Sequence, residues 1–342
     1  MPAPDSRSPI QSLVEQYLPL INERLVQLIQ REEQIPNLHE GVLYSLGLDD
    51  PAADGGKRLR PVMCLASADA LGVDVRQALP FACAIELMHN FALVHDDIED
   101  GDVSRRNRPS TYIRYGLAHG VNIGDYLLCK VLSSLLDQPE IPAEKRLQLL
   151  QLMSTTLDHT HYGQALDISA RQQRHFTREE YYRLVREKTG YYLAAPILGA
   201  ALLADSPTEL RAAIQRYGEY IGPLFQITDD VLDLTSGKGR NGVIGNDLRE
   251  GKRSYLVAAT CDRATPSQVK RLFDILDAPR EETTDAMIAE AVQLFTECGA
   301  LEDAQQEANS LLEKGLATLR ALPAPLEALL QQFATSLVDR KR

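Results

Sequence analysis

Apolar residues recur along most of the chain at intervals of three and four, the spacing that places them on one face of an α-helix. In the first such segment Ser8-Pro9 has the pattern of an N-cap followed by proline at the first helical position, and the periodic residues extend from Ile10 to Gln30. Alternation with a period of two, which is typical of strands, is scarce. The pattern predicts an all-α fold. Further helices are expected at residues 61–70, 77–95, 121–136, 144–166, 178–203, 208–233, 250–261, 267–276, 284–297, 301–321 and 325–338.

The breaks between these segments are short enough to be helix connections. They fall at residues 49–56, 101–109, 138–142, 206–207, 236–245 and 323–325. No low-complexity linker separates two halves, so we expect residues 1–342 to form a single large helical domain, long enough to bury a sizeable core.

Composition narrows the class of protein. Hydrophobic residues make up 44% of the chain and charged residues 25%, as in ordinary globular proteins, and the formal net charge of -12 argues against a nucleic-acid surface. The longest apolar run, residues 191–204, is too short to span a bilayer and contains Pro196, and the first residues lack the pattern of a signal peptide. The 5 cysteines form no CxxC pair, which favours reduced thiols in the cytoplasm, with Cys64 and Cys83 in the core. We expect a cytoplasmic protein without a membrane span.

One predicted helix ends in an acidic cluster. The segment 81–109 is apolar for about three turns and then carries five acids from Asp96 to Asp102. Asp96 and Asp100 are four positions apart and share a helix face, with Asp97 beside them. Like charges at this spacing repel, whereas Mg²⁺ bound by carboxylates and substrate phosphates reverses the sign of the interaction. A single DDxxD also suits a solvated acidic helix end.

The second half repeats the motif. Residues 224–234 read LFQITDDVLDL, where Asp229 and Asp233 again share a face and Asp230 lies beside them. Two such motifs, each at the end of an apolar helix, favour two carboxylate clusters that hold several Mg²⁺ ions. A cluster of this kind calls for a polyanionic ligand, and diphosphate is the natural candidate.

Cationic residues alternate with the acidic clusters. GGKRLRP at 55–61 places Lys57, Arg58 and Arg60 after a diglycine, where backbone amides and guanidinium groups can approach an anion, although the segment alone also suits a basic loop. Three further sets follow along the chain: Arg105-Arg106, Lys188-Thr189 and Lys252. This layout is expected of a site that binds two anions, one through metal and one directly.

Two other patterns are set aside. GKGRNG at 237–242 matches GxGxxG, but no apolar strand precedes it, so a dinucleotide site is not predicted. His159 and His161 are two positions apart on a predicted helix and do not face one way, so we interpret them as packing or surface residues and not as a zinc pair.

In combination, these motifs resemble the trans-type (E) isoprenyl diphosphate synthases, the polyprenyl synthetase family, including its geranylgeranyl and farnesyl diphosphate synthases. GGKRLRP, HDDIED followed by RR, GQALD at 163–167, KTG at 188–190, FQITDDVLD and DLREGK at 247–252 stand in the family's order. The resemblance covers residues 50–256 and implies a helical bundle around a central cavity. It also implies a homodimer formed through long helices, for which apolar stretches such as 121–136 are available.

The resemblance assigns roles to individual residues. Three Mg²⁺ ions per active site are implied, and they grip the allylic diphosphate; isopentenyl diphosphate is the second substrate. The implied metal ligands are Asp96, Asp97, Asp100, Asp229, Asp230 and Asp233. The implied contacts of the allylic diphosphate are Arg105, Lys188, Thr189, Gln226 and Lys252. The implied contacts of isopentenyl diphosphate are Lys57, Arg60, His89 and Arg106, with Arg58 also counted among the substrate-binding residues.

The chain departs from the family pattern at two places. The family usually has RRG after the first motif, and here Asn107 takes the place of the glycine; asparagine tolerates left-handed backbone, so we expect the turn to survive. In the loop 237–246 many members carry a lysine that grips the allylic diphosphate, and this chain has Gly242 or Val243 there, with Lys238 or Arg240 as possible substitutes.

Product length and competing functions complete the expectations. A growing prenyl chain extends alongside the helix that precedes Asp96, so Met88, Phe91 and Ala92 are the candidate chain-length residues. An aromatic residue five positions before the motif accompanies short products in the family, and geranylgeranyl diphosphate (C20) is the predicted product, with farnesyl diphosphate or a longer chain as the alternative. Phe91 also suits a core residue that points away from the cavity. Two other functions stay open: a terpene cyclase, and a non-catalytic partner subunit of a heteromeric synthase.

Overall fold

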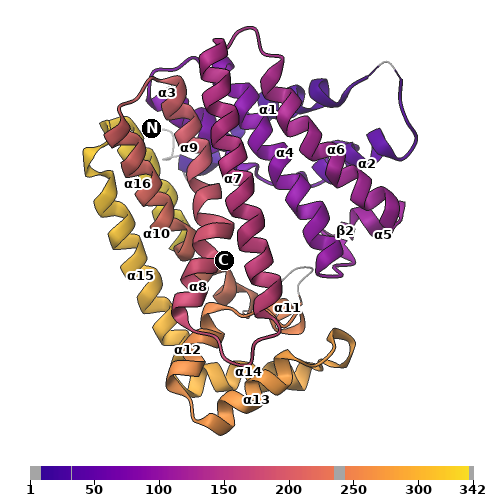
Figure 1. Cartoon of the computed structure of the whole chain (residues 1–342), viewed down its shortest axis with the longest axis vertical. Coiled ribbons are helices and arrows are strands. Elements are labelled where there is room, and N and C mark those ends of the chain that lie inside the picture. The colour runs from indigo at the N-terminus through magenta and orange to yellow at the C-terminus, as the bar shows by residue number, and fades with distance from the viewer. Residues whose placement is uncertain (1–8, 32, 235–242, 339–342) are drawn as a thin grey trace, which may run out of the picture. The chain divides into compact units, whose positions relative to one another are not determined.

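The computed structural model describes residues 9–31, 33–234 and 243–338. Nearly all of the described elements are helices, and the sheet found among them is one antiparallel hairpin of β1 (Ser104–Arg105) and β2 (Arg108–Pro109). The all-α prediction is confirmed (Figure 1). The helices are α1 (Pro9–Ile29), α2 (Leu38–Leu46), α3 (Leu59–Ala70), α4 (Val75–Glu99), α5 (Thr111–Tyr115), α6 (Leu117–Leu136), α7 (Ala143–Ala170), α8 (Arg178–Val185), the π-helical turn η1 (Arg186–Gly190), α9 (Tyr191–Leu203), α10 (Thr208–Asp233), α11 (Asn246–Arg249), α12 (Tyr255–Arg263), α13 (Pro266–Leu276), the 3₁₀ turn η3 (Arg280–Glu282), α14 (Asp285–Glu297), α15 (Ala300–Thr318), the 3₁₀ turn η4 (Leu319–Ala321) and α16 (Ala324–Val338).

Several segments differ from the predicted helices, among them the short helices α5 and α11, which were not predicted. Helix α2 was not predicted; it has only nine residues and lies between Asn37 and Gly47, which both have left-handed backbone. The segment expected to be one helix from 178 to 203 is divided by η1. The helix expected at 250–261 begins only at Tyr255, because Gly251 has a φ of +66° and interrupts the preceding short helix α11. Residues 237–242, with Lys238, Arg240 and the GxGxxG match, lie outside the described residues, and our interpretations of them stay predictions.

The chain divides into two compact units. The first comprises the described residues within 1–155, 195–212 and 322–333, and the second those within 156–194, 213–321 and 334–342. The first acidic cluster belongs to the first unit and the second acidic cluster to the second unit. Whether residues 1–342 form a single domain stays a prediction.

Helix α4 is the core of the first unit and packs between α3 and α6 (Figure 1). It is apolar on all sides, and Phe81, Cys83, Ile85 and Leu87 are fully buried, as expected of a helix surrounded by others. Among the described residues it is also the one helix long and apolar enough to cross a membrane, and 72% of that stretch is buried inside the protein. Cys64 on α3 is likewise fully buried, so both core cysteines were predicted correctly.

In the second unit α12 packs against α8, α13, α14 and α15. Its first residue, Tyr255, is completely buried, and so is Phe295 on α14. Two of its neighbours begin with side-chain caps: Thr177 forms a reciprocal capping box with Glu180 at the start of α8, and Thr265 does the same with Gln268 at the start of α13. These caps fix where the helices around α12 begin.

Candidate active site

The first acidic cluster lies at the carboxyl end of α4. A helix has its partial negative charge there, so carboxylates at this end are unfavourable unless a cation is near. Arg105 supplies one: its Nε and Nη2 donate to Asp97 Oδ1 at 2.7 and 2.5 Å, and Nη2 lies 3.9 Å from Asp96 Oδ2. Asp97 and Asp100 are buried, and Asp96 is partly exposed. The structure therefore brings the predicted carboxylates and one predicted diphosphate ligand together.

The β1–β2 hairpin positions the two consecutive arginines. Its two loop residues, Arg106 and Asn107, both have left-handed backbone, with φ of 52° and 61°, which is the conformation of a type I′ turn. The expectation that asparagine tolerates the glycine position is confirmed. Arg106 Nη1 donates to Gly55 O at 2.9 Å, so the hairpin is joined to the diglycine loop. Arg108 donates to both carboxylate oxygens of Asp49 at 2.9 and 2.5 Å, which holds the base of the hairpin.

Positive charges gather around His89. The pKa of this imidazole is held well below its usual value, first by burial and then by the charges of Arg60, Arg106 and Arg105. Burial also lowers the pKa of Arg106. Lys57, in the diglycine loop, is exposed. A neutral histidine beside several guanidinium groups offers hydrogen-bond donors and positive charge to an anion, and diphosphate fits such a site. A small cavity of about 30 Å³ is lined in part by Asp97, Arg105 and Arg106, and so adjoins both this region and the first acidic cluster.

Arg58 has a different environment from its neighbours. Its side chain is 1% exposed and donates to Glu86 Oε1 at 2.8 Å, Asn22 Oδ1 at 2.6 Å and Leu46 O at 2.7 Å. These bonds join α1, α2, α3 and α4. Arg58 was predicted to bind substrate, and the contacts described here are those of a structural residue.

The second acidic cluster lies at the end of α10. Asp230 is buried; its Oδ2 accepts from Tyr255 N at 3.1 Å and Tyr181 OH at 3.3 Å, and its Oδ1 accepts from Gln226 Nε2 at 2.9 Å. Burial, together with the charge of Asp247, raises the pKa of Asp230 to about 8. The same two causes raise the pKa of Asp233 to about 7, and its Oδ2 accepts from Asp247 N at 3.1 Å. Asp229 is exposed.

The predicted lysines of the second unit surround one buried carboxylate. Lys188 Nζ donates to Asp167 Oδ2 at 2.6 Å. Burial acts to raise the pKa of Asp167, but the charges of Lys188 and Lys252 hold it below its usual value. Lys252 Nζ also lies 3.2 Å from Asp247 Oδ1 and 2.5 Å from Glu250 Oε2. Asp167 is the last residue of the GQALD motif, to which the sequence assigned no separate role.

Lys188 and Thr189 lie in the π-helical turn η1, and Thr189 is buried. A π-turn inside a helix frequently marks a functional site. A Cβ at position 163 would come within 2.2 Å of Lys188 N, so only glycine allows α7 to pass this close to the turn. On the other side, a Cβ at Gly222 would lie 2.7 Å from Gly190 Cα. Close helix contacts thus fix where η1 presents its side chains.

The donor chemistry of both clusters fits hard divalent cations, since each offers three carboxylates. Within the described ranges 9–31, 33–234 and 243–338, no three His, Cys, Asp or Glu side chains are already gathered as ligands around one point. His159 is stacked on Tyr191 at 3.5 Å and contacts Glu187 at 2.5 Å, while His161 is exposed, as expected of packing and surface residues. A joint metal site of the two clusters stays a prediction.

The candidate chain-length residues all lie on α4. Met88 and Phe91 are buried, and Ala92 is partly exposed. The ring of Phe91 meets that of His95 edge to face, with 5.0 Å between centroids. Their role in product length stays a prediction.

Sequence reasoning assigned no role to Tyr181, Tyr255, Asp167 or Asp247, although each of them contacts a predicted site residue. Tyr181 and Tyr255 are 49 and 25 positions from Asp230. No local pattern marks such contacts; only the fold brings the residues together.

Comparisons with known proteins identify the family of the chain. A model of the family described as polyprenyl synthetase matches residues 46–295. The geranylgeranyl diphosphate synthase of Methanosarcina mazei is 35% identical over 289 residues, which cover 84% of this chain and 86% of that protein. The structure of geranylgeranyl pyrophosphate synthetase from Pyrococcus horikoshii has a TM-score of 0.86 at 30% identity and covers 97% of this chain and 98% of its own. The structure of polyprenyl synthase from Caulobacter crescentus complexed with calcium and isoprenyl diphosphate has a TM-score of 0.83 at 26% identity, with 99% and 100% covered. The chain belongs to the polyprenyl synthetase family and has its all-α isoprenoid synthase fold.

Proposed function

We propose that the protein is a short-chain prenyltransferase that condenses isopentenyl diphosphate head-to-tail with dimethylallyl, geranyl and farnesyl diphosphate, ending at geranylgeranyl diphosphate. The observation that carries this proposal is the group of positive charges around His89, in the same unit as the first acidic cluster. An enzyme that only ionises an allylic diphosphate at a metal has no use for a second, metal-independent anion site. The names of the relatives support the same reaction.

In the proposed mechanism, Lys188, Thr189, Gln226, Lys252 and Arg105 hold the diphosphate of the allylic substrate. Divalent cations held by the two acidic clusters would neutralise charge on that leaving group. The allylic C–O bond breaks and leaves a delocalised cation, which the double bond of isopentenyl diphosphate attacks to form the new C–C bond. The proton lost from the adjacent carbon goes to the released diphosphate, so no side-chain base is needed, and no side-chain nucleophile is needed because the double bond is the nucleophile.

The second substrate is held by Lys57, Arg60, His89 and Arg106. These groups bind its diphosphate but take part in no bond making or breaking. They orient its double bond toward the allylic carbon. Water would quench the cation, so the reacting carbons lie in an apolar cavity in this proposal.

Incubation with geranyl diphosphate, isopentenyl diphosphate and Mg²⁺ tests the reaction. Diphosphate is expected only when both substrates are present. Its release from the allylic substrate alone, with hydrocarbon or alcohol as product, would identify a terpene cyclase instead. A purified protein that becomes active only with a second chain would identify a non-catalytic partner subunit of a heteromeric synthase; the altered loop that includes Val243 is the feature that suggests this alternative.

Mg²⁺ is the proposed metal, with three ions per active site. Six carboxylates in two clusters are enough to share them. Asp96→Ala and Asp229→Ala are each expected to reduce turnover by orders of magnitude with the helical circular dichroism unchanged. If a variant keeps near-normal turnover, the acidic cluster it belongs to is not part of the active site.

Product length is proposed to depend on Phe91. If its buried ring is the floor of the cavity, Phe91→Ala makes chains longer than C20, whereas Met88→Ala in the next turn has a smaller effect. An unchanged product spectrum in Phe91→Ala, together with longer chains in Met88→Ala, would move the floor to Met88. Farnesyl diphosphate as the end product of the wild type would favour the shorter alternative.

We also propose a homodimer formed through α6. Along one side of this helix, apolar side chains recur at helical spacing while exposed, a pattern that suits a surface covered by a second copy. Light scattering at micromolar concentration is expected to give twice the mass of one chain. The exposed apolar residues are Leu117, Val121, Leu132 and Leu136.

The remaining proposals concern the whole chain. We propose one domain over residues 1–342 and a cytoplasmic location; all 5 cysteines are free, which agrees with a reducing compartment. Small diphosphate substrates, and not nucleic acid or a membrane, are the proposed binding partners, in agreement with the net charge of -12.

A further inference from the structure

The carboxylate of Asp230 is held from outside its own helix by two donors. Tyr181 OH, from α8, and Tyr255 N, at the first residue of α12, both donate to Oδ2, at 3.3 and 3.1 Å. Asp230 therefore lies at the amino end of α12, where backbone N–H groups favour negative charge. The Tyr181 hydroxyl is the only one of the two donors that a side-chain substitution can remove.

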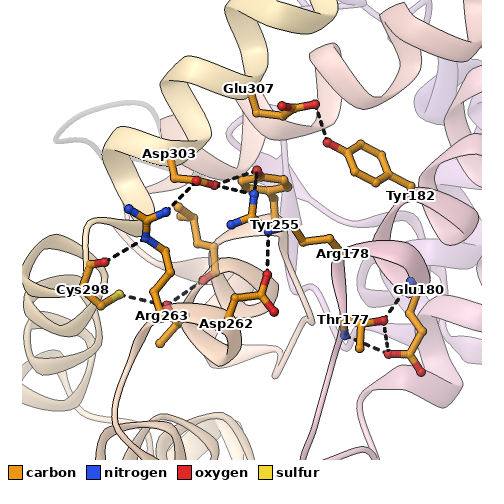
Figure 2. Close-up of polar contacts among 12 residues, drawn as sticks. Thr177, Arg178, Glu180, Tyr182, Tyr255, Asp262, Arg263, Cys298, Asp303 and Glu307 are labelled. Carbon is orange, nitrogen blue, oxygen red and sulfur yellow. Dashed lines mark hydrogen bonds and ion pairs between the residues drawn. The ribbon is translucent and has the colours of Figure 1, made fainter.

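Tyr181 belongs to a cluster of three tyrosines whose rings pack edge to face. Its ring lies 5.4 Å from that of Tyr255 and 5.8 Å from that of Tyr182, and the remaining pair is 6.4 Å apart. Each hydroxyl has a different carboxylate partner. Tyr182 OH donates to Glu307 Oε1 at 2.7 Å and Tyr255 OH donates to Asp303 Oδ2 at 2.8 Å (Figure 2), so within the cluster Tyr181 alone directs its hydroxyl to the acidic cluster.

Ion pairs fix the outer side of the tyrosine cluster. Arg178 Nη1 donates to Tyr255 OH at 2.7 Å and lies 2.8 Å from Asp303 Oδ2, while its Nε donates to Asp262 Oδ2 at 2.7 Å (Figure 2). Arg263 Nη1 bonds the other oxygen of Asp303 at 2.9 Å. Single ion pairs of this exposure contribute little free energy, but a shared network fixes the geometry of its members. The two rings that pack against Tyr181 are thus joined to α15 through Glu307 and Asp303.

We propose that Tyr181 is a positioning residue: its hydroxyl fixes the Asp230 carboxylate in the orientation in which the second acidic cluster takes up a divalent cation together with diphosphate. The inference rests on the proposed function of that cluster. A donor on Oδ2 selects one side-chain rotamer of Asp230 and directs its remaining lone pairs. Partners of this kind around metal-binding carboxylates typically change metal affinity by 10–100-fold.

The test compares two neighbouring tyrosines. Tyr181→Phe and Tyr182→Phe each remove one hydroxyl bonded to a carboxylate and keep the aromatic ring, but only the first hydroxyl contacts Asp230. Binding of Mn²⁺ in the presence of inorganic diphosphate is measured by electron paramagnetic resonance on the full-length protein. The ion that Asp229→Ala loses defines the one held by the second cluster.

For that ion, Tyr181→Phe is expected to raise the dissociation constant about tenfold, and Tyr182→Phe to leave it at the wild-type value. In assays, the Mg²⁺ concentration that gives half-maximal rate should rise in the same proportion, with the KM for isopentenyl diphosphate unchanged. Tyr255→Phe, which keeps its backbone N–H to Asp230 and loses the hydroxyl contacts with Asp303 and Arg178, is expected to give a smaller increase and serves as the test if Tyr181→Phe does not fold.

Different results would refute the positioning role of Tyr181 and the proposed metal role of the second acidic cluster. If the wild type binds Mn²⁺ with diphosphate and Tyr181→Phe binds as tightly, the positioning role is refuted while the proposed function stands. Equal weakening in Tyr181→Phe and Tyr182→Phe would also refute it, because it would show a loss of packing. A wild type in which Asp229→Ala removes no ion would refute the metal role of the second cluster, and the inference with it.

Discussion

Replacing Asp230 by asparagine is expected to stabilise the metal-free protein above neutral pH. The carboxylate is buried, and its pKa is raised from 3.8 to about 8. Between these values the folded protein binds a proton that the unfolded chain has lost, so the free energy of unfolding falls as pH rises from about 4 to 8 and is constant above. Asparagine has no proton to bind and removes this dependence.

The size of the stabilisation by Asp230→Asn follows from the shift in the pKa of Asp230. At pH 7 the carboxyl is about three pH units above its ordinary pKa, and each unit is worth about 1.36 kcal/mol, so the burial costs on the order of 4 kcal/mol. Asparagine keeps an oxygen that accepts from Tyr255 N and Tyr181 OH. Its new NH₂ group can donate to the side-chain oxygen of Gln226 once that amide turns over. Part of the gain is lost in this rearrangement, and we expect about 1–4 kcal/mol of stabilisation at pH 7.

The assay is thermal unfolding of wild type and Asp230→Asn in EDTA between pH 4.5 and 8.5. The difference in unfolding temperature is expected to be near zero at the acid end and to grow toward pH 8. Some pH dependence remains in the variant, because the pKa of Asp233 is also raised, to about 7. With Mg²⁺ and diphosphate the order reverses, since ligands stabilise the protein that binds them more tightly.

Asp229→Asn is the matched control. It removes the neighbouring carboxylate, which is exposed and whose charge is the last of the causes that raise the pKa of Asp230, so it should change the pH dependence of unfolding much less than Asp230→Asn while it reduces activity. A stabilisation by Asp230→Asn that is the same at pH 4.5 and 8.5, or that is absent at both, would refute the argument from burial.

Two other substitutions separate structure from binding in the first unit. Arg58→Ala leaves Glu86 buried without its cation and is expected to cost about 3–5 kcal/mol in urea unfolding, whereas Lys57→Ala, which removes an exposed side chain, should keep stability and raise the KM for isopentenyl diphosphate; equal stability of the two variants would contradict the structural role of Arg58. Asn107→Gly should keep activity and stability within about 1 kcal/mol, whereas Asn107→Val cannot adopt a φ of 61° without strain and should displace Arg106, which a raised KM for isopentenyl diphosphate would show; a Val variant with wild-type kinetics would contradict it.

Much of this fold follows from the helical period, because long helices with one apolar face carry their own signal. Helices α1 and α10 lie within a residue or two of their predicted ranges. The nine residues of α2 are too few to show a period, and η1 is invisible to it, since the π-turn depends on the close contact of Gly163 with Lys188 N. The local hydrophobic pattern therefore predicts the long helices. Where a helix is interrupted depends on the size of the side chains at contacts between helices, which the pattern does not show.

The same distinction between local pattern and distant contacts applies to the site residues. The acidic clusters and the Asn107 turn are read from neighbours in sequence, and the structure has them where the motifs place them. The burial of Arg58 is decided by Asn22, Leu46 and Glu86, up to 36 positions away, so a motif rich in arginine cannot distinguish a structural guanidinium from one that binds substrate. The same holds for Tyr181, whose contact with Asp230 no spacing predicts.

Both acidic clusters are arrangements that folding alone disfavours. The first sets carboxylates at the negative end of a helix, and the second buries Asp230 and leaves Asp233 partly buried, with pKa values raised to about 8 and 7. The cations around His89 are the complementary case, because the charges of several arginines act on one imidazole. In the proposed function, divalent metal offsets the cost of the acids and diphosphate that of the cations. We therefore expect metal and the allylic diphosphate to bind cooperatively, since the positive charge of the metal lies against the negative charge of the diphosphate and each lowers the free energy of placing the other.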